Sequence, residues 1–388
     1  MTSTAPPVER AHRECAERFD PPACTTSAPG RVNLVGGHTD YNDGWVLPAA
    51  IDRRTAVAAR ERDDDRLRVS SEATDEERVV PLDGDSTGTW TDYVAGVTWA
   101  LREEGVSTPG ADLAIASDVP PGAGLASSAA LEVAVAGALC ELAEVVPDPT
   151  DLARTCRRAE NEFVGVSCGV LDQFATVFGR ADHALELDCR SLDAEYVPLD
   201  ADRARLVAVD TNVHHELADS AYGERRATCE RGVELLAAEL DRDFDALRDV
   251  TPEAFARVAP SLPETVELRC RHVVRENERV REAADALRRE DYETAGDRMW
   301  ASHASLRDDY EVSCAELDAV VEIAGGIEGV YGARMTGGGF GGSVVALVRP
   351  DTVDAFREAV DREYPERTGR EADVYACAPD DGLRVESV

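Results

Sequence analysis

The amino-acid sequence predicts an α+β fold. Segments with the alternating pattern of β-strands and segments with helical periodicity follow each other without a regular βαβ rhythm, which argues against a doubly wound parallel sheet. The chain is helical in character from residue 215 to about 325, and strand patterns return after that region. A length of 388 residues indicates two or three domains with substantial hydrophobic cores.

The first predicted elements surround a loop that contains glycine. The alternation in "DLAIASD" indicates a strand over 112–118, and the alanine- and valine-rich run after the loop indicates a helix over 126–144. A helix and three strands are expected next, at 150–166, 183–189, 194–199 and 204–211. The first two of these strands, "HALELDC" and "AEYVPL", are expected to form a hairpin.

The C-terminal part again mixes the two patterns. We expect a strand near 330–335, the loop "TGGGFGG" at 336–342 and the strand "SVVALV" at 343–348. A helix near 351–364 and the strand "ADVYAC" at 372–377 complete the order. The glycine-rich loop is therefore expected to lie between two strands.

Acidic residues greatly outnumber basic ones. All 41 basic residues are arginine, and 77 acidic residues bring the formal net charge to −36. Such a chain repels nucleic acid, so no nucleic-acid partner is expected. The 43% of hydrophobic residues argues against disorder. We interpret the acidic, lysine-free composition as halophilic, because concentrated salt screens most of the self-repulsion.

The absence of lysine excludes several mechanisms. A Walker A loop requires lysine, protein kinases use a strand lysine, and Schiff-base catalysis needs an amine. The sequence also contains no G-x-S-x-G and no H-E-x-x-H motif. Any phosphate chemistry must therefore rely on arginine, backbone N–H groups or a metal ion.

The chain shows no sign of export or of membrane insertion. The N-terminal "MTSTAPPVER" lacks the features of a signal peptide, and no run approaches the roughly 18 apolar residues of a membrane span. The ten cysteines include no C-x-x-C pair, which is typical of reduced thiols. We therefore expect a cytoplasmic protein with no membrane partner.

The stretch "PPGAGLASSAALE" over 120–132 is typical of a loop that opens a helix and presents free N–H groups to an anion. We interpret it as a phosphate-binding loop in which one serine hydroxyl meets a magnesium ion. The alternative is an ordinary serine N-cap before a buried helix. The residues concerned are Pro121, Gly122, Ala123, Gly124, Leu125, Ala126, Ser127 and Ser128.

A second glycine-rich loop surrounds Phe340. Its glycines indicate backbone that must come very close to another group, although a flexible hairpin is the alternative. A dinucleotide site is not expected, because the loop does not join a strand to a helix. The residues concerned are Gly337, Gly338, Gly339 and Gly341.

The stretch "APGRVNLVGGHTDYN" over 28–42 places polar side chains beside glycine turns. Arg31, His38, Asp40 and Tyr41 belong to this set. Such clusters often bind a polyhydroxylated ligand, and the alternative is a solvated loop.

Asp172 lies among apolar neighbours in "CGVLDQFATVFG" over 168–179. An acid in that setting is either paired or functional, and Glu160 is close enough in sequence to share its site. His214 and His215 lack metal-ligand spacing and are expected to be surface or hydrogen-bonding residues.

In their order and spacing, several stretches resemble the motifs of the GHMP kinase superfamily. "PPGAGLASSAA" is similar to its ATP-phosphate loop, and "MTGGGFGGS" to its C-terminal glycine motif. "GRVNLVGGHTDYNDG" resembles the N-terminal signature of the galactokinase family. "CGVLDQFATVFG", "DTNVHHELADSAYGERR" (210–226) and "SHASLRDDYEVSCAELD" (302–318) resemble further blocks of that family.

The resemblance implies an ATP- and Mg²⁺-dependent kinase that phosphorylates the anomeric hydroxyl of galactose. It also implies a two-lobed fold, with an N-terminal lobe like domain 2 of ribosomal protein S5 and a ferredoxin-like C-terminal lobe. We place these lobes at 1–205 and 206–388, with the site between them. Galactose and ATP are the expected partners, and the protein is expected to be a monomer or a weak homo-oligomer.

The resemblance further implies roles for residues by position. Asp172 matches the catalytic aspartate and Arg31 the arginine beside it, while Ser128 and Glu160 match the magnesium ligands. Trp90 matches an aromatic residue of the adenine pocket. The expected sugar contacts are Gly37, His38, Asp40, Gly169, Asp172 and Tyr222.

Two positions depart from the pattern of the family. Ala126 replaces a serine, which removes a hydroxyl but leaves the backbone N–H. Gly37 replaces a glutamate that contacts the primary-hydroxyl end of the sugar, so we expect empty space there, a raised KM for galactose and tolerance of changes at carbon 6. The alternatives are a kinase for arabinose, 6-deoxygalactose or a mevalonate-type alcohol, and a non-catalytic sugar sensor.

Overall fold

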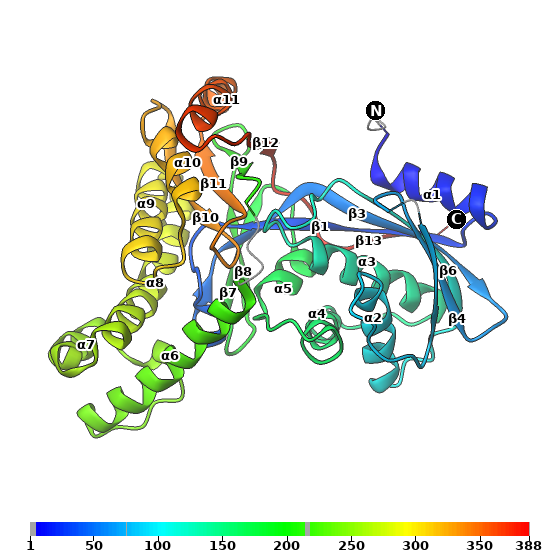
Figure 1. Ribbon diagram of the computed structural model, residues 1–388, viewed down its shortest axis with the longest axis horizontal. Coiled ribbons are helices and arrows are strands. Elements are labelled where there is room, and N and C mark those ends of the chain that lie inside the picture. The colour runs from blue at the N-terminus through cyan, green and yellow to red at the C-terminus, as the bar shows by residue number, and fades with distance from the viewer. Residues whose placement is uncertain (1–4, 75, 214–217, 388) are drawn as a thin grey trace.

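Two large β-sheets organise the molecule, one in each half of the view in Figure 1. The computed structural model describes residues 5–74, 76–213 and 218–387. His214 and His215 lie outside the described residues. Within the described part of the chain, strands and helices alternate irregularly, and the predicted α+β class is confirmed.

The N-terminal region is built on a six-stranded sheet. Its strands are β1 (Cys24–Asn33), β3 (Pro48–Arg62), β4 (Arg66–Ser71), β5 (Glu76–Pro81), β6 (Gly110–Ser117) and β13 (Arg384–Ser387). They lie in the order β13-β1-β3-β6-β4-β5, and only β4 and β6 run parallel. The C-terminal end of the chain thus returns to this sheet, and Figure 1 shows both termini beside it.

The two faces of this sheet follow the two-residue period of a strand. On β3, Ala56 and Ala58 pack against α1 (Pro7–Arg18), whereas Val57 and Ala59 belong to the core on the opposite face. The helices that cover this second face are α2 (Asp92–Glu103) and α3 (Ser127–Leu142). The packing of α3 against this sheet therefore fixes the position of the loop that precedes the helix.

Shorter elements connect the two regions. They are η1 (Asp40–Asn42), β2 (Trp45–Val46), α4 (Pro149–Arg158), η2 (Ala159–Val164), α5 (Leu171–Phe178), β7 (His183–Asp188) and β8 (Ala194–Pro198). The expected hairpin is confirmed, because β7 and β8 pair antiparallel. The expected helix over 150–166 is observed as α4 followed directly by the π-helical η2, which ends before Gly165, whose φ is 87°.

The C-terminal region is built on a four-stranded antiparallel sheet in the order β10-β11-β9-β12. Its strands are β9 (Arg205–Asp210), β10 (Val330–Thr336), β11 (Ser343–Val348) and β12 (Asp373–Cys377). The α-helices of this region are α6 (Ala218–Leu240), α7 (Pro252–Val258), α8 (Glu264–Arg288), α9 (Tyr292–Asp308), α10 (Ala315–Gly325) and α11 (Val353–Thr368). Short 3₁₀ turns are η3 (Leu247–Asp249), η4 (Ala259–Ser261) and η5 (Pro350–Thr352).

This second sheet is buried on both faces. Val207 and Val209 of β9 belong to the core under the helices, whereas Leu206 and Ala208 belong to a core that also contains Val32 of β1. A shared hydrophobic core therefore joins the two regions. The division at residue 205 stays a prediction. Among the described residues, no helix is long and apolar enough to cross a membrane.

Candidate active site

A cavity of about 230 Å³ gathers many of the residues that the sequence singled out. Its walls come from β1 and the segment after it, from η2 and the start of α5, and from α6 and the loop between β10 and β11. The predicted site residues that line the cavity are Arg31, Gly37, His38, Asp40, Glu160, Gly169, Asp172, Tyr222, Gly337 and Gly338. Residues far apart in the sequence therefore meet at one place.

Asp172 is held at the cavity by an ion pair with Arg31. Nε and Nη2 of Arg31 donate to the two carboxylate oxygens of Asp172, each at 2.7 Å. Nη1 of Arg31 donates to the carbonyl oxygen of Gly124 at 2.6 Å. Because Arg31 is only 5% exposed, packing as well as charge fixes this geometry. One side chain thus joins the candidate catalytic acid to the candidate phosphate loop.

The candidate phosphate loop ends at the N-terminus of α3. Ser127 and Ser128 are the first two residues of that helix, and no side chain of the described residues caps it. The cap position is Ala126, with a φ of 59°, so the alternative of a serine N-cap is wrong. The N–H groups of the first turn are therefore available to an anion at the positive end of the helix.

The loop between β10 and β11 packs against the phosphate loop. Gly124 and Gly337 have φ values of 72° and 81°, and a Cβ on Gly337 would lie 3.3 Å from the carbonyl oxygen of Gly124. The Ser343 hydroxyl donates to the carbonyl oxygen of Ala123 at 2.6 Å. These contacts favour close backbone approach over a flexible hairpin.

Glu160 lies on η2 next to Ser128. The Ser128 hydroxyl hydrogen-bonds to the Glu160 carboxylate, and Nε2 of Gln173 donates to Oε2 of Glu160 at 2.7 Å. Burial, followed by the charge of Asp172, raises the pKa of Glu160. The two predicted magnesium ligands are therefore neighbours in the structure.

Gln173 and Glu132 were not identified from the sequence. Nε2 of Gln173 also donates to Oε2 of Glu132 at 3.1 Å, so the amide bridges two carboxyl groups. Burial and the charge of Glu160 raise the pKa of Glu132 well above its ordinary value. The signal in the sequence is an acid in the middle of the apolar run of α3, between Leu131 and Val133.

The donor set at Ser128 and Glu160 fits a magnesium ion. Hydroxyl and carboxylate oxygens are the atoms that Mg²⁺ prefers, and one or two such groups usually hold it together with substrate phosphates. Within the described part of the chain, no group of three or more His, Cys, Asp or Glu side chains could hold a metal ion. The protein alone therefore offers a partial coordination shell, which nucleotide phosphates would complete.

His38 is held in one neutral tautomer. Its Nε2 lies 3.2 Å from the carbonyl oxygen of Gly338, which only accepts, so Nε2 carries the hydrogen. Its Nδ1 therefore accepts from the Tyr41 hydroxyl at 2.9 Å. Burial and the nearby His272 lower the pKa of His38 to about 3. Both ring nitrogens of His38 are thus occupied within the protein, which fixes the orientation of the ring at the cavity.

Asp40 lies directly over Gly169. A Cβ at position 169 would be 1.6 Å from Oδ2 of Asp40, so only glycine permits this approach. Burial and the charge of Asp172 raise the pKa of Asp40 to about 6. Tyr222 adds an aromatic wall, with its ring centre 5.6 Å from that of His38. The set offers donors, acceptors and an apolar face, as a sugar site requires.

The eight predicted residues of the phosphate loop, 121–128, do not line the cavity, and neither do Trp90, Gly339 and Gly341. Trp90 is half-buried against the core of the six-stranded sheet. A Cβ on Gly339 or Gly341 would lie 2.3 Å from the carbonyl oxygen of Val312 or Val213, respectively. Both glycines therefore allow the loop to pack on neighbouring backbone, and the role expected for Trp90 stays a prediction.

The expectation of empty space beside Gly37 is wrong. A Cβ at this position would lie 2.7 Å from Nη2 of Arg334 and 3.2 Å from Cδ2 of Leu306. These side chains come from β10 and α9, which pack behind the segment after β1. The space is filled by elements that the local sequence around Gly37 does not reveal.

Comparison with known proteins establishes the family. The galactokinase galactose-binding signature matches residues 12–61, the GHMP kinases N-terminal domain residues 92–180, and the GHMP kinases C-terminal model residues 283–366. A galactokinase of Roseiflexus sp. (strain RS-1) is 46% identical over 377 residues, which cover 95% of this chain and 96% of the relative. The chain belongs to the galactokinase family. A galactokinase of Chloroflexus aurantiacus is 47% identical over 94% of this chain and 93% of the relative.

Solved structures of this superfamily share the fold. The crystal structure of Lactococcus lactis galactokinase complexed with galactose is similar with a TM-score of 0.92 and 36% identity, covering 97% of this chain and 99% of that chain. Methanococcus jannaschii mevalonate kinase shares the fold at a TM-score of 0.65 and 16% identity, over 92% of this chain and 98% of that chain. The expected GHMP kinase fold and galactokinase family are both confirmed.

Proposed function

We propose that this protein transfers the γ-phosphoryl group of ATP to the anomeric hydroxyl of D-galactose, giving galactose 1-phosphate and ADP. The observation that carries this proposal is the ion pair of Arg31 with Asp172, at a cavity beside the N-terminus of α3. Phosphoryl transfer depends mainly on positioning and charge stabilisation, and this arrangement supports a sugar site next to a phosphate site. Membership of the galactokinase family supports the choice of sugar.

The geometry supports the following roles for the reacting groups. Asp172 accepts, or at least orients, the proton of the anomeric hydroxyl while that oxygen attacks the γ-phosphorus. Arg31 keeps Asp172 in place and stabilises the charge on the moving phosphoryl group. The N–H groups of the loop from Gly122 to Ser128 bind the nucleotide phosphates.

Ser128 and Glu160 would hold a magnesium ion together with those phosphates. When bound, the ion supplies positive charge that neutralises the β- and γ-phosphate oxygens. Arg31 and the helix N–H groups supply the positive charge and hydrogen-bond donors that a lysine supplies in many other phosphate sites. Ser128 and Glu160 also position each other through their hydrogen bond.

The sugar binds on the other side of the cavity. We assign its contacts to the residues expected from the sequence, with Gly37 at the primary-hydroxyl end, and we assign the adenine pocket to Trp90. The sugar contacts are Gly37, His38, Asp40, Gly169, Asp172 and Tyr222.

ATP turnover with a panel of alcohols tests the proposal. ADP release should be fastest with D-galactose and slower with arabinose, 6-deoxygalactose and mevalonate, each measured against a sample without sugar. Sugar binding without turnover would identify a sensor, and a clear preference for another alcohol would change the substrate.

The acidic composition leads to a further prediction about salt. With a formal net charge of −36, self-repulsion at low ionic strength should open the fold, whereas at 1 M salt the Debye length is about 3 Å. Helical circular dichroism and kinase activity should therefore rise together with KCl. Full activity after dialysis into dilute buffer would contradict the halophilic interpretation.

We also propose that the chain has two lobes, at 1–205 and 206–388, and that the protein is a monomer or a weak homo-oligomer.

A further inference from the structure

Gln173 is a buried polar side chain beside the reacting aspartate. It is the only glutamine among the 388 residues, and it follows Asp172 directly on α5. Asp172 lines the cavity, whereas Gln173 is 0% exposed and does not line it. The proposed phosphoryl transfer does not use this amide, so its contacts must explain its place.

The Gln173 amide is held through one end only. Nε2 donates to Oε2 of Glu160 at 2.7 Å and to Oε2 of Glu132 at 3.1 Å. Oε1 has no hydrogen-bond partner among the described residues. A buried amide oxygen without a partner is costly, and the reversed amide would place this acceptor against Oε2 of Glu160. The two glutamates therefore determine the orientation of the amide.

Glu160 receives two neutral donors at one oxygen. Besides the amide of Gln173, Sγ of Cys168 donates to its Oε2, at 3.2 Å. The Ser128 hydroxyl hydrogen-bonds to the same carboxylate, and Glu160 lines the cavity. Hydrogen bonds to a ligating carboxylate restrict its rotation and orient it toward the metal ion. Gln173 and Cys168 therefore fix the direction in which the Glu160 carboxylate faces Ser128.

Glu132 connects the amide to the helix that carries Ser128. It lies four residues after Ser128 on α3, so the two side chains share one face of the helix. The amide of Gln173 thus joins α3 to η2, the segment that carries Glu160. One side chain therefore spans the two elements from which the candidate magnesium ligands come.

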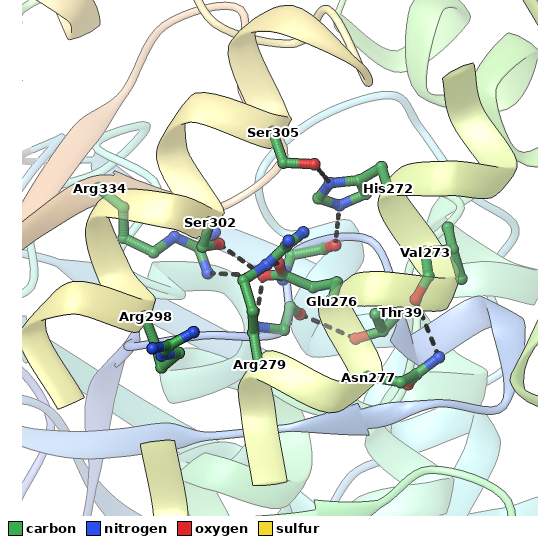
Figure 2. A network of polar contacts seen from close by, with 12 residues as sticks. Thr39, His272, Val273, Glu276, Asn277, Arg279, Arg298, Ser302, Ser305 and Arg334 are labelled. Carbon is green, nitrogen blue, oxygen red and sulfur yellow. Dashed lines mark hydrogen bonds and ion pairs between the residues drawn. The ribbon is translucent and has the colours of Figure 1, made fainter. Parts of the chain in front are cut away.

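The donors at Glu160 are neutral, which leaves the charge of the carboxylate for a cation. At another buried glutamate the partner is an arginine: Figure 2 shows Arg279 beside Glu276, and Nε of Arg279 donates to Oε2 of Glu276 at 2.5 Å. An arginine compensates a carboxylate, whereas an amide or a thiol orients it without compensating its charge. In a chain with 41 arginines, the amide at position 173 therefore suits a carboxylate that binds a metal ion.

We infer that Gln173 is a positioning residue for the metal-bound nucleotide, because its amide aligns Glu160 with Ser128. Glu132 in turn holds the amide. This inference rests on the proposed function, which assigns Ser128 and Glu160 to the magnesium ion. Removing a group that orients a metal ligand typically lowers metal affinity by about 10–100-fold. Gln173 does not line the cavity, so it takes no part in the bond changes.

Calorimetric titration with AMP-PNP, a non-hydrolysable analogue of ATP, tests the inference. The ratio of its Kd in EDTA to its Kd in Mg²⁺ measures how much the metal ion strengthens nucleotide binding. Gln173→Met keeps the volume but removes the donor, so this ratio should fall about tenfold or more, while the Kd in EDTA stays the same. A ratio within a few-fold of wild type would make Gln173 a packing residue only and would overturn the inference.

Two further variants show which claim fails. Thr176→Val, on the same helix, removes a buried hydroxyl that has no partner among the described residues, and it should leave the ratio unchanged. Glu160→Gln removes the assigned ligand and should abolish the effect of Mg²⁺. An undiminished effect in Glu160→Gln, or none in wild type, would overturn the magnesium assignment of the proposed function and this inference with it. Loss in Glu160→Gln without loss in Gln173→Met would overturn this inference alone.

Variants of Glu132 test the inference even where Gln173→Met does not fold. Glu132→Gln keeps an acceptor oxygen for the amide and should retain most of the ratio. Glu132→Met keeps the volume without an acceptor and should lower the ratio toward the value expected for Gln173→Met. An equal fall in both variants, or none in either, would overturn the inference that Glu132 holds the amide. Circular dichroism and an unchanged Kd for D-galactose check the fold of each variant.

Discussion

Two glutamates of equal burial lie in the two regions of the molecule, and their surroundings act on them in opposite ways. Glu132 on α3 and Glu276 on α8 are both 0% exposed. Burial and the charge of Glu160 raise the pKa of Glu132 well above its ordinary value. Burial would raise that of Glu276 too, but cations led by Arg279 hold its pKa far below its ordinary value. Burial alone therefore does not set the charge of a carboxyl group, and the sign of its neighbours decides.

The same contrast separates the two ends of the cavity. At the reacting end, the carboxyl groups of Glu132, Glu160 and Asp172 lie close together, and burial with the charge of the neighbouring acids raises the pKa of Glu132 and of Glu160. Behind Gly37, Arg334 presents positive charge with two unpaired nitrogens. The two ends therefore differ in their buried charges: carboxyl groups surround the first, and a guanidinium lies behind the second.

The largest effect is expected from removing the ionised member of the glutamate pair. Glu276→Gln keeps the shape but leaves buried cations without a counter-charge, which should lower the free energy of unfolding by about 3–5 kcal/mol. Chemical unfolding at neutral pH measures this loss. Glu276 contributes stability above its ordinary pKa of 4.5, so the gap between wild type and variant should shrink as the pH falls below that value. Glu278→Gln, an exposed neighbour on α8, is the control and should change stability by less than about 0.5 kcal/mol.

Next in size is the loss of the reacting carboxylate. Asp172→Asn removes the proton acceptor while leaving the cavity walls, so kcat should fall about 10²–10⁴-fold and sugar binding should persist. Steady-state kinetics and sugar titration check the two parts separately. Asp151→Asn, on the exposed side of α4, is the matched control. Turnover of Asp172→Asn within a few-fold of wild type would make Asp172 a structural acid only.

A moderate effect of pH on kcat/KM is expected from the titration of Asp40, which we assign to the sugar site. Because the pKa of Asp40 is raised to about 6, its acceptor charge is lost as the pH falls through that value rather than near 3.8. Below pH 6, kcat/KM for galactose should therefore fall up to about tenfold per unit. Asp40→Asn should show a low, flat profile, with circular dichroism at each pH as the check on folding. A wild-type profile that stays level down to pH 5 would contradict this role.

The smallest effect is expected at the neutral glutamate. Glu132→Gln resembles the protonated acid, so the free energy of unfolding below pH 4.5 should change by less than about 1 kcal/mol. Since the pKa of Glu132 is raised, its favourable contribution is complete below 4.5 and is lost as the pH rises through the raised value. The variant should therefore gain on wild type toward alkaline pH in thermal or chemical unfolding. A loss as large as that of Glu276→Gln would show that Glu132 is ionised.

The sequence by itself determined the class of the protein and much of its reacting end. The strand and helix periodicities of the hydrophobic residues predicted β9, α3 and the hairpin of β7 with β8. They could do so because the burial of one face of an element depends on the local spacing of its apolar residues. The order of the motifs identified the family, and with it the pairing of Arg31 with Asp172 and of Ser128 with Glu160. The absence of lysine excluded whole classes of mechanism, because an amine that the chain does not contain cannot be supplied by folding.

Only the tertiary structure decided what lies behind Gly37 and how the buried acids are charged. Arg334 reaches Gly37 from β10 and Glu276 reaches it from α8, and neither approach follows from the residues around position 37. The bridge from Gln173 to Glu132 likewise joins segments that are distant in the chain. Electrostatic interaction depends on distance in space and on exclusion of water, and a one-dimensional pattern specifies neither.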